Sequence, residues 1–281
     1  MSDFPLNGSE IQAFITTAFA EDIAGGDVTC ETVIPGDARL TAVMNARQSM
    51  CVAGLRLAKA AFLTLDPDCH FDEHCGDGDP LIAGQPMLTI TGNARALLSA
   101  ERTALNIVQH LSGIATLTAE YVAAIGDHKA KLLDTRKTTP GLRALQKYAV
   151  AQGGGTNHRM GLFDAVMIKD NHIAVVGSVA AAIKGPKAAG RADIQVECDT
   201  LDQVREAVKA GANSLLLDNM APPILLEALA IVDGRIPCEA SGGVTLESIR
   251  AIAATGVDYI SVGRLTQSAP AVDIGLDYST A

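Results

Sequence analysis

The sequence is poor in aromatic side chains and in positive charge. Tryptophan is absent, aromatic residues make up 4% of the 281 positions, and the formal net charge is −10. Nucleic-acid modules that stack bases depend on aromatic side chains, and nucleic acids and anionic membranes attract basic surfaces. The composition therefore argues against a nucleic-acid partner and against an anionic membrane partner.

Long apolar segments and paired cysteines are also missing. No stretch approaches the ~20 apolar residues of a membrane span. The N-terminal sequence lacks the basic and unbroken apolar parts of a secretory signal. The six cysteines form no CxxC pair, and the cluster of Cys69, His70, His74 and Cys75 matches no standard metal motif. We therefore expect free thiols and a cytoplasmic protein, rather than disulfides or a zinc site.

The first part of the chain mixes helices and strands irregularly, which is typical of an α+β domain. Apolar spacing predicts helices at Gly8–Glu21, Leu55–Leu65 and Ala100–Leu111, with Ser9 and Ser99 as N-caps of the first and last. Short strands are predicted at Leu40–Asn45, Met50–Ala53 and Met87–Thr91. Arg102, Asn106 and Gln109 share one side of the third helix, and the pattern alone predicts that this side is solvated.

From Gly113 onward, predicted strands and helices alternate. The strands are Lys131–Asp134, Ala165–Lys169, Ile194–Cys198, Ser214–Asp218, Pro237–Ser241 and Tyr259–Val262. The helices are Leu142–Ala151, Val179–Ala182, Leu201–Ala210, Ile224–Ile231 and Leu246–Ala254. The loops Ala210–Asn213 and Ala254–Asp258 each offer a glycine C-cap. The later strands recur roughly every 20–25 residues, as βα units of a TIM-type barrel do. Six units indicate an incomplete barrel, and a doubly wound open sheet is the alternative.

Basic residues gather in the segment 134–174 against the acidic background. They are Arg136, Lys137, Arg143, Lys147, His158, Arg159 and Lys169. A solvated helix face accounts for Arg143 and Lys147, which are four residues apart on a predicted helix. Arg136, Lys137 and Lys169 instead follow apolar strands, at the end where α/β barrels carry their active sites. The segment therefore indicates a site for a small, highly charged anion.

Other strand ends carry complementary groups. Glu197 and Asp218 are carboxylates suited to sugar hydroxyls or to a phosphate-bound Mg²⁺. The last two strands lead into the glycine turns Ser241–Gly243 and Val262–Arg264. Exposed N–H groups of such turns bind phosphate. The sequence thus predicts a substrate with several negative charges, one of them a phosphate, and a hydroxylated or metal-bound group between them.

Several longer motifs resemble the quinolinate phosphoribosyltransferase family. They include Glu101-Arg-Thr-Ala-Leu-Asn106, Asp134-Thr-Arg-Lys-Thr-Thr-Pro-Gly-Leu-Arg143, Gly153-Gly-Gly155 with Asn157-His-Arg159, Lys169-Asp-Asn-His172, Leu217-Asp-Asn-Met220, Ser241-Gly-Gly243 and Ile260-Ser-Val-Gly263. The resemblance spans nearly the whole chain. It implies an N-terminal α/β sandwich at 1–112, joined by the tail 266–281, and an incomplete α/β barrel of TIM type at 113–265. It also implies a homodimer, with higher assembly open, in which each sandwich covers the partner's barrel.

The family reaction converts quinolinate and phosphoribosyl pyrophosphate (PRPP) into nicotinate mononucleotide, pyrophosphate and CO₂, with Mg²⁺, in NAD synthesis. The resemblance implies that Arg136, His158, Arg159 and Lys169 bind the quinolinate carboxylates, joined by Arg102 from the neighbouring subunit. It places Thr135 and Lys137 beside this pocket and the pyrophosphate. Glu197 and Asp218 are expected to meet the ribose and Mg²⁺. The 5′-phosphate would bind at Ser241, Gly242, Gly243, Val262, Gly263 and Arg264. Arg264 stands where the family often has a small residue. The residues expected to act in catalysis are Lys137, Lys169, Glu197 and Asp218.

Three alternatives stay open from the residues. Lys169 ends a predicted barrel strand, where a Schiff-base lysine of an aldolase-like enzyme would be well placed. A non-catalytic phosphometabolite-binding homologue would bind quinolinate without turnover. A paralogue linked to molybdenum transport shares the implied fold, but the intact Asn157–Arg159 and Lys169–His172 motifs favour the quinolinate enzyme.

Overall fold

A computed structural model describes residues 4–279, which form two compact units. The first unit contains the chain up to residue 119, residues 144–154 and the residues from 268 onward. The second contains residues 120–143 and 155–267. The domain boundaries predicted from the sequence differ mainly in placing residues 144–154 with the second domain. Among the described residues, no helix combines the length and the apolar character needed to cross a membrane.

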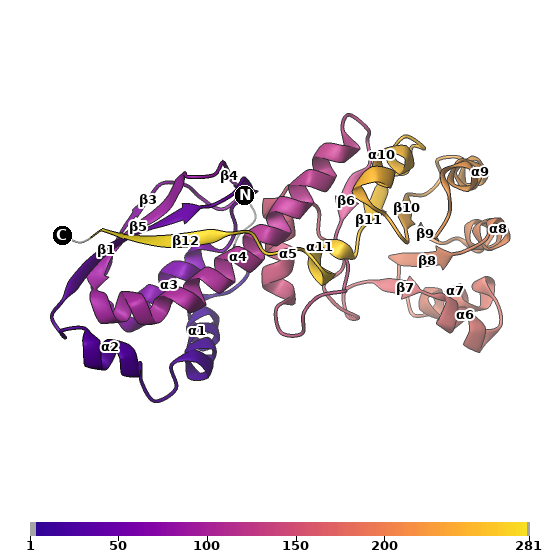
Figure 1. Cartoon of the computed structure of the whole chain (residues 1–281). Coiled ribbons are helices and arrows are strands. Elements are labelled where there is room, and N and C mark those ends of the chain that lie inside the picture. Colours follow the sequence, from indigo (N-terminus) through magenta and orange to yellow (C-terminus); the bar gives the residue numbers. More distant parts are fainter. Residues whose placement is uncertain (1–3, 280–281) are drawn as a thin grey trace. The chain divides into compact units, whose positions relative to one another are not determined.

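The first unit is built on a four-stranded antiparallel sheet in the order β12-β1-β5-β3. Its strands are β1 (Arg39–Ala46), β3 (His70–Glu73), β5 (Pro86–Asn93) and β12 (Ile274–Ser279). β12 comes from the end of the chain and pairs Leu276 with Met44 (Figure 1). Met44, Leu88 and Ile90 are fully buried. Two short strands, β2 (Met50–Cys51) and β4 (Pro80–Leu81), form a separate pair.

Helices complete the first unit. They are α1 (Gly8–Asp22), α2 (Val28–Val33), α3 (Leu55–Leu65), α4 (Ala94–Ile125) and α5 (Arg143–Gln152), of which α4 and α5 extend beyond it by a few residues. The N-cap of α1 is Asn7, whose side chain accepts from the N–H groups of Ser9 and Glu10. The prediction of Ser9 as the cap was therefore wrong. Ser99 is not a cap either, because α4 begins five residues earlier and the Ser99 hydroxyl donates to Asp27 at 2.8 Å.

Two polar helix faces are less solvated than the sequence pattern predicts. Lys147 on α5 is only 2% exposed, so the solvated-face interpretation is wrong for this lysine. On α4, Arg102 and Asn106 are exposed, but the Gln109 amide donates to the carbonyl of Ile274 at 2.9 Å. The last strand of the chain thus covers part of a face that local spacing assigns to solvent.

The second unit contains a six-stranded parallel sheet in the order β6-β11-β10-β9-β8-β7. The strands are β6 (Lys131–Leu133), β7 (Val166–Ile168), β8 (Ile194–Cys198), β9 (Ser214–Asp218), β10 (Cys238–Ser241) and β11 (Tyr259–Ser261). Consecutive strands from β7 to β11 are neighbours, and β6 then pairs with β11. A doubly wound sheet would reverse direction at a switch point, so that alternative is wrong. The sheet is a TIM-type barrel left open between β6 and β7.

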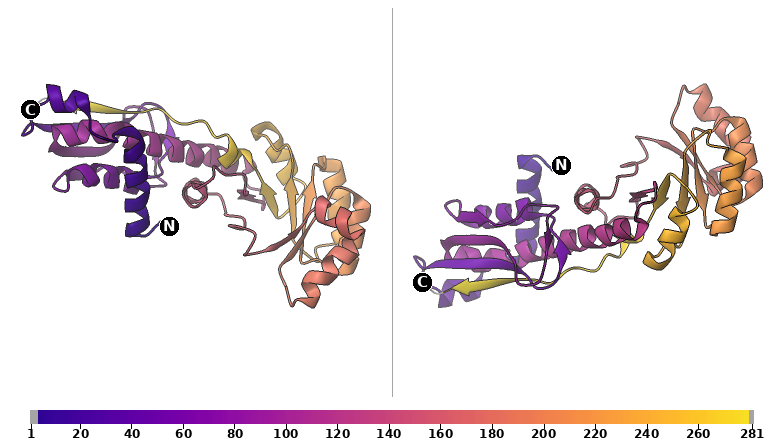
Figure 2. Two further views of the ribbon diagram at one scale, coloured as in Figure 1. Left: turned by 90° about the horizontal axis from the view of Figure 1, so that it is seen from below. Right: turned by 90° about the horizontal axis from the view of Figure 1, so that it is seen from above.

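Helices lie along the outer side of this sheet (Figures 1 and 2). They are α6 (Asp170–Val176), α7 (Val179–Ala188), α8 (Leu201–Ala210), α9 (Pro222–Val232) and α10 (Leu246–Ala253). The short helix α11 (Arg264–Gln267) instead follows the carboxyl end of β11 directly. Gly211 ends α8 in the left-handed conformation, φ 79°, as predicted. The C-cap of α10 is Ala254 rather than the predicted glycine. Because all strands are parallel, the residues that follow them meet at one edge of the sheet.

Candidate active site

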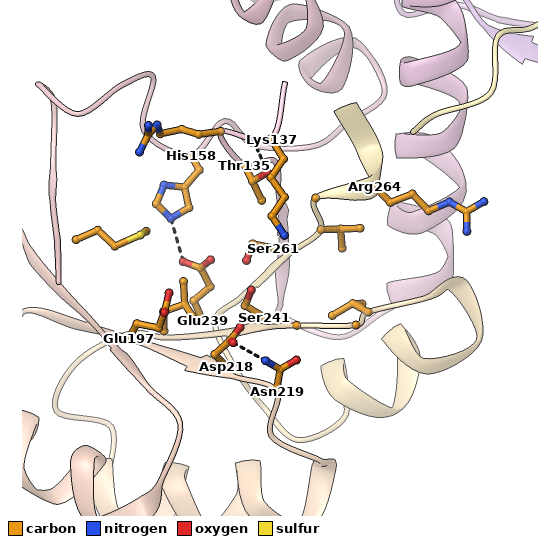
Figure 3. A pocket seen from close by; sticks show the side chains of 18 of the residues that line it. Thr135, Lys137, His158, Glu197, Asp218, Asn219, Glu239, Ser241, Ser261 and Arg264 are labelled. Carbon is orange, nitrogen blue, oxygen red and sulfur yellow. Dashed lines mark hydrogen bonds and ion pairs between the residues drawn. The ribbon is translucent and has the colours of Figure 1, made fainter. Parts of the chain in front are cut away.

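A cavity of about 650 Å³ lies at the carboxyl ends of the parallel strands (Figure 3). Apart from Arg102, which is exposed on α4, every residue predicted for the site lines this cavity. These residues are Thr135, Arg136, Lys137, His158, Arg159, Lys169, Glu197, Asp218, Ser241, Gly242, Gly243, Val262, Gly263 and Arg264. The segment 134–174 and the later strand ends, which are far apart in the sequence, therefore form one site.

Two guanidinium groups dominate one side of the cavity. Arg159 donates to the carbonyl of Ala165 at 3.1 Å and approaches Sδ of Met167 at 3.4 Å. Its pKa is lowered by burial and by the positive charge of Arg136. Nε of Arg136 is buried and has no hydrogen-bond partner within residues 4–279. Asp164 offsets the lowering of the Arg159 pKa only in part, and among the residues that the structure describes no ion pair joins either guanidinium to a carboxylate. Two neighbouring cations of this kind form a site for an anion with more than one negative charge.

Lys169 connects this cationic side to the acidic side. Its Nζ donates to Oε2 of Glu197 at 2.8 Å, and the Glu197 side chain is 11% exposed. The backbone N–H of Lys169 donates to Nδ1 of His172 at 2.9 Å, at the start of α6. Lys169 is thus held at the end of β7, where it lines the cavity and forms an ion pair with Glu197.

The fully buried carboxylate of Asp134 anchors the loop that carries His158. Asp134 accepts from the Asn157 amide at 2.7 Å and from the His158 backbone N–H at 2.8 Å. Nδ1 of His158 accepts from the Arg159 N–H at 2.7 Å, and Nε2 lies 3.1 Å from Oε2 of Glu239. In this arrangement both ring nitrogens are occupied by protein groups. Direct contact of the imidazole with an anion, as the family resemblance implies, therefore requires one of these bonds to open.

The acidic side consists of Glu197 on β8 and Asp218 on β9. Oδ2 of Asp218 accepts from the Asn219 amide at 2.5 Å. Asn219 has a positive φ of 54°, and its N–H donates to the carbonyl of Ser241 at 2.9 Å. The strained Asn219 backbone thus ties the end of β9 to the end of β10. One oxygen of each carboxylate, Oε1 of Glu197 and Oδ1 of Asp218, has no partner among the described residues and is available to a ligand.

Glycines shape the third side of the cavity. Gly242 has φ +91°, and a Cβ there would overlap with Oδ1 of Asn219. At Gly263 a Cβ would lie 2.8 Å from Cδ of Lys137. Gly242 therefore excludes a side chain, whereas at Gly263 a side chain would require Lys137 to move. Gly242 and Gly243 lead into α10, whose N-cap is Thr245.

Arg264 is exposed, and its side chain points away from Lys137 and Asp218 in Figure 3. Its charge lies near Tyr121 and Glu247 instead. Sequence reasoning did not assign Asn219, Glu239 or Ser261 to the site, although all three line the cavity. The signal for Glu239 was its place two residues before Ser241, because alternate residues of a strand face the same side.

This fold and this cavity define an enzyme class: α/β-barrel enzymes that act on phosphorylated, multiply charged small molecules. The model of the C-terminal domain of quinolinate phosphoribosyl transferase matches residues 114–277, and that of the N-terminal domain matches residues 27–112. The chain belongs to the quinolinate phosphoribosyltransferase family, which confirms the resemblance seen in the motifs.

Individual relatives match this chain over nearly its full length. The chain is 44% identical over 274 residues to a probable nicotinate-nucleotide pyrophosphorylase (carboxylating) of Bacillus subtilis, covering 97% of this chain and 94% of that protein. It is 45% identical to the Mycobacterium leprae nicotinate-nucleotide pyrophosphorylase (carboxylating) over 275 residues, 94% of this chain and 95% of that one. The crystal structure of NadC from Streptococcus pyogenes superposes with a TM-score of 0.94 at 39% identity, covering 100% of both chains.

Proposed function

We propose that the cavity of the second unit is where this family's reaction takes place. As a member of the family, the protein transfers the phosphoribosyl group of PRPP to quinolinate and releases pyrophosphate and CO₂. The product is nicotinate mononucleotide, and the reaction belongs to NAD biosynthesis. The observation that carries the assignment of the cavity is the pair of guanidiniums, Arg136 and Arg159, facing the carboxylates of Glu197 and Asp218.

Quinolinate would bind on the cationic side. Its two adjacent carboxylates match Arg136 and Arg159, neither of which forms an ion pair with a carboxylate among the described residues, with Lys169 beside them. Arginine can bind each carboxylate through two parallel hydrogen bonds. In this proposal His158 holds the loop that carries Arg159 in place. Burial of the guanidiniums strengthens their attraction for the dianion, because the local dielectric constant is lower than that of water.

PRPP would bind across the rest of the cavity. The ribose hydroxyls would donate to the available oxygens of Glu197 and Asp218. The 5′-phosphate would be bound by backbone N–H groups of the turns at Ser241–Gly243 and Val262–Arg264. Because the Arg264 side chain points away, we assign only its backbone to this subsite. Thr135 and Lys137 would lie beside the pyrophosphate.

The donor set fits Mg²⁺, which prefers oxygen ligands and usually binds one or two carboxylates together with substrate phosphates. Glu197 and Asp218 would hold the ion through the same oxygens that accept from the ribose hydroxyls, since a carboxylate oxygen can take more than one contact. When bound, Mg²⁺ would neutralise charge on the departing pyrophosphate.

Catalysis would then rest on positioning and charge stabilisation. The pyridine nitrogen attacks the anomeric carbon as the bond to pyrophosphate breaks, and positive charge develops on the ribose ring. Glu197 and Asp218 stabilise that charge. The carboxylate next to the alkylated nitrogen then leaves as CO₂, and its bonding electrons stay on the pyridinium ring until a proton replaces it. Nζ of Lys169 is engaged in an ion pair with Glu197 at 2.8 Å, which argues against its use as a Schiff-base nucleophile.

We further propose a cytoplasmic homodimer in which Arg102 of each subunit enters the partner's cavity. This would give the exposed Arg102 of α4 a role in binding quinolinate.

Turnover of the purified protein tests the proposal. Quinolinate, PRPP and Mg²⁺ are supplied, and nicotinate mononucleotide and CO₂ are followed, with nicotinate as the parallel substrate. We expect product from quinolinate alone. Product from nicotinate as well would show that the cations do not select the second carboxylate, and tight binding of quinolinate without product would support a non-catalytic protein.

A further inference from the structure

Glu239 is a buried carboxylate that the proposed reaction leaves without a role. It lies on β10, lines the cavity and is 2% exposed. A buried carboxylate is costly unless hydrogen bonds compensate the loss of water. Its partners therefore indicate what the group does.

Both donors to Glu239 converge on one oxygen. Oε2 accepts from the Gln195 amide at 2.7 Å and from Nε2 of His158 at 3.1 Å. The other oxygen, Oε1, is buried without a hydrogen-bond partner in the described part of the chain. In Figure 3 the bonded oxygen of Glu239 faces His158 and the other faces away from it. The carboxylate is thus oriented so that Oε2 bonds to the imidazole, and Oε1 is left without a hydrogen bond among the described residues.

The hydrogen bonds of His158 determine its tautomer. Nδ1 accepts a hydrogen bond from the Arg159 backbone N–H at 2.7 Å, so it carries no hydrogen of its own. The ring hydrogen of the neutral imidazole must then be on Nε2, where it donates to Glu239. A histidine with the other tautomer would place a bare Nε2 against the carboxylate.

We propose that Glu239 is a positioning residue: it fixes the tautomer and the orientation of His158, and through His158 it holds the position of Arg159. This inference rests on the proposed assignment of the quinolinate site.

Two carboxylates anchor the loop from opposite sides of His158. Asp134 binds the Asn157 amide and the His158 backbone, and Glu239 binds the far end of the His158 ring. The bond from the Arg159 N–H to Nδ1 links the ring directly to the backbone of Arg159. The His158 ring therefore links Glu239 of β10 to the backbone of Arg159 through one hydrogen bond at each ring nitrogen. Without Glu239, the ring can rotate, and Arg159 loses one of the contacts that keep its guanidinium beside Arg136.

The tautomer is measured first, because this readout does not depend on activity. The protein has six histidines, so ¹⁵N-labelled imidazole signals can be resolved, and loss of one set in His158→Asn assigns that residue. In the wild-type protein we expect separate pyridine-type Nδ1 and pyrrole-type Nε2 signals for His158. In Glu239→Ala we expect these to merge toward averaged values, as in a free imidazole. Unchanged signals in Glu239→Ala would overturn the proposal.

Steady-state kinetics then test the consequence. We expect the KM for quinolinate to rise about 10- to 100-fold in Glu239→Ala, by analogy with the loss on removing a carboxylate that orients a metal-bound histidine. The KM for PRPP should change far less, because the hydrogen bonds that hold the His158 ring lead to Glu239 and to the backbone of Arg159, which are not assigned to PRPP. Equal increases in both values would indicate general damage to the cavity and would overturn the proposal. Glu73→Ala, which removes only a surface partner of Lys59, is the control.

Glu239→Gln separates positioning from charge. The single amide oxygen can accept both existing bonds, since both now go to Oε2. We expect this variant to keep the His158 tautomer and a quinolinate KM near that of the wild type. Behaviour like that of Glu239→Ala would show that the negative charge is what matters, which contradicts positioning. If the wild-type protein shows no turnover of quinolinate, the proposed site fails, whereas the tautomer measurement still decides the role of Glu239.

Discussion

At the scale of single residues, the most specific prediction concerns the adjacent Arg136 and Arg159, which are assigned to quinolinate. Burial and the charge of Arg136 lower the pKa of Arg159, and Asp164 offsets this lowering only in part. Nε of Arg136 is buried without a hydrogen-bond partner among the described residues. Arg136→Ala should cost ~2–4 kcal/mol of transition-state stabilisation, by analogy with the loss of one oxyanion donor. We therefore expect kcat/KM for quinolinate to fall by about 30- to 900-fold.

The control for this prediction is Arg39→Ala, which removes an exposed arginine of β1. Arg136→Lys should recover only part of the activity, because lysine cannot form two parallel hydrogen bonds to one carboxylate. Near-normal turnover of Arg136→Ala would refute the assignment of this side of the cavity to quinolinate.

The sequence predicted which charged residues gather but not how they bond. Arg136, Lys169, Glu197 and Asp218 could be placed together because each follows a predicted strand, and ends of parallel strands meet. The interaction of His158 with Glu239 joins residues 81 positions apart, and no local pattern encodes it. The burial of Lys147 was missed for a similar reason. Helical spacing describes a single helix, whereas the exposure of a side chain depends on which other elements pack against that helix.

At the scale of elements, the turn after β10 depends on Gly242. Its φ of +91° is a conformation that L side chains rarely adopt, and an added Cβ would clash with Asn219. A Gly→Ala replacement at a compatible position stabilises a protein by up to ~1 kcal/mol, whereas Gly242→Ala should destabilise it by more than that amount. The substitution should also raise the KM for PRPP, because the turn is assigned to the phosphate.

Thermal unfolding and steady-state kinetics check this prediction, with Gly36→Ala as the control. At Gly36 an added Cβ would have no atom within 4 Å, and its φ is not positive. A Gly242→Ala protein with unchanged melting temperature and unchanged KM for PRPP would show that the turn tolerates a side chain and does not bind the phosphate.

The short helix α2 depends on the ionised N-cap Asp27. Its carboxylate accepts from the N–H groups of Thr29 and Cys30, at 3.1 and 2.9 Å. These hydrogen bonds, with that from Ser99, lower the pKa of Asp27 from 3.8 to about 2. Since the folded pKa lies below the unfolded one, the stabilisation is present above pH 3.8 and is lost as the pH falls toward 2.

Asp27→Asn provides the matching variant, because asparagine caps a helix nearly as well but does not titrate in this range. We expect the melting temperatures of the two proteins to differ most near neutral pH and to converge as the pH falls from about 5 to 2. A difference that stays constant over this interval would show that Asp27 is not ionised as its contacts indicate.

Long, periodic elements could be predicted from the sequence, and short or polar ones could not. Helices α1, α3 and α8 and strands β8 and β9 occur within one residue of their predicted bounds. The elements α2, β3, β4, α6, α11 and β12 were not predicted. Several of these are only two to six residues long, and β3 is exposed along most of its length, so no apolar period marks it. Tertiary pairing, rather than local propensity, determines such elements.

At the scale of the whole molecule, the thiols provide a test of packing. All six cysteines are free, and burial raises the pKa of each thiol, to about 11 for Cys51, Cys69 and Cys75 and about 12 for Cys198 and Cys238. Because the thiolate is the reactive species, we expect very slow reaction with an aromatic disulfide at pH 8. Rapid reaction of all six should follow denaturation, and fast titration of the native protein would contradict the packing.

The order of the strands in the parallel sheet is also a property of the whole molecule. The alternation of strands and helices in the sequence predicted six βα units, but it left open whether they form a barrel or a doubly wound sheet. The decision rests on β6 pairing with β11, more than 120 residues along the chain, through Leu133 and Ser261. The C-terminal strand β12 shows the same limit, because its partner β1 lies near the other end of the sequence.

Mixing of inactive variants tests the proposed dimer. If Arg102 of one subunit acts in the partner's cavity, Arg102→Ala and Lys169→Ala place both defects in the same site of a mixed dimer. One site of that dimer then carries both substitutions, and the other carries neither. We expect each variant alone to be nearly inactive and the re-associated mixture to recover activity, measured as nicotinate mononucleotide formation. Arg136→Ala mixed with Lys169→Ala is the matched control: both residues line the same chain's cavity, so each site of the mixed dimer keeps one defect and no activity should return. Absence of recovery in the first mixture, with mixed dimers present, would place Arg102 outside the partner's active site.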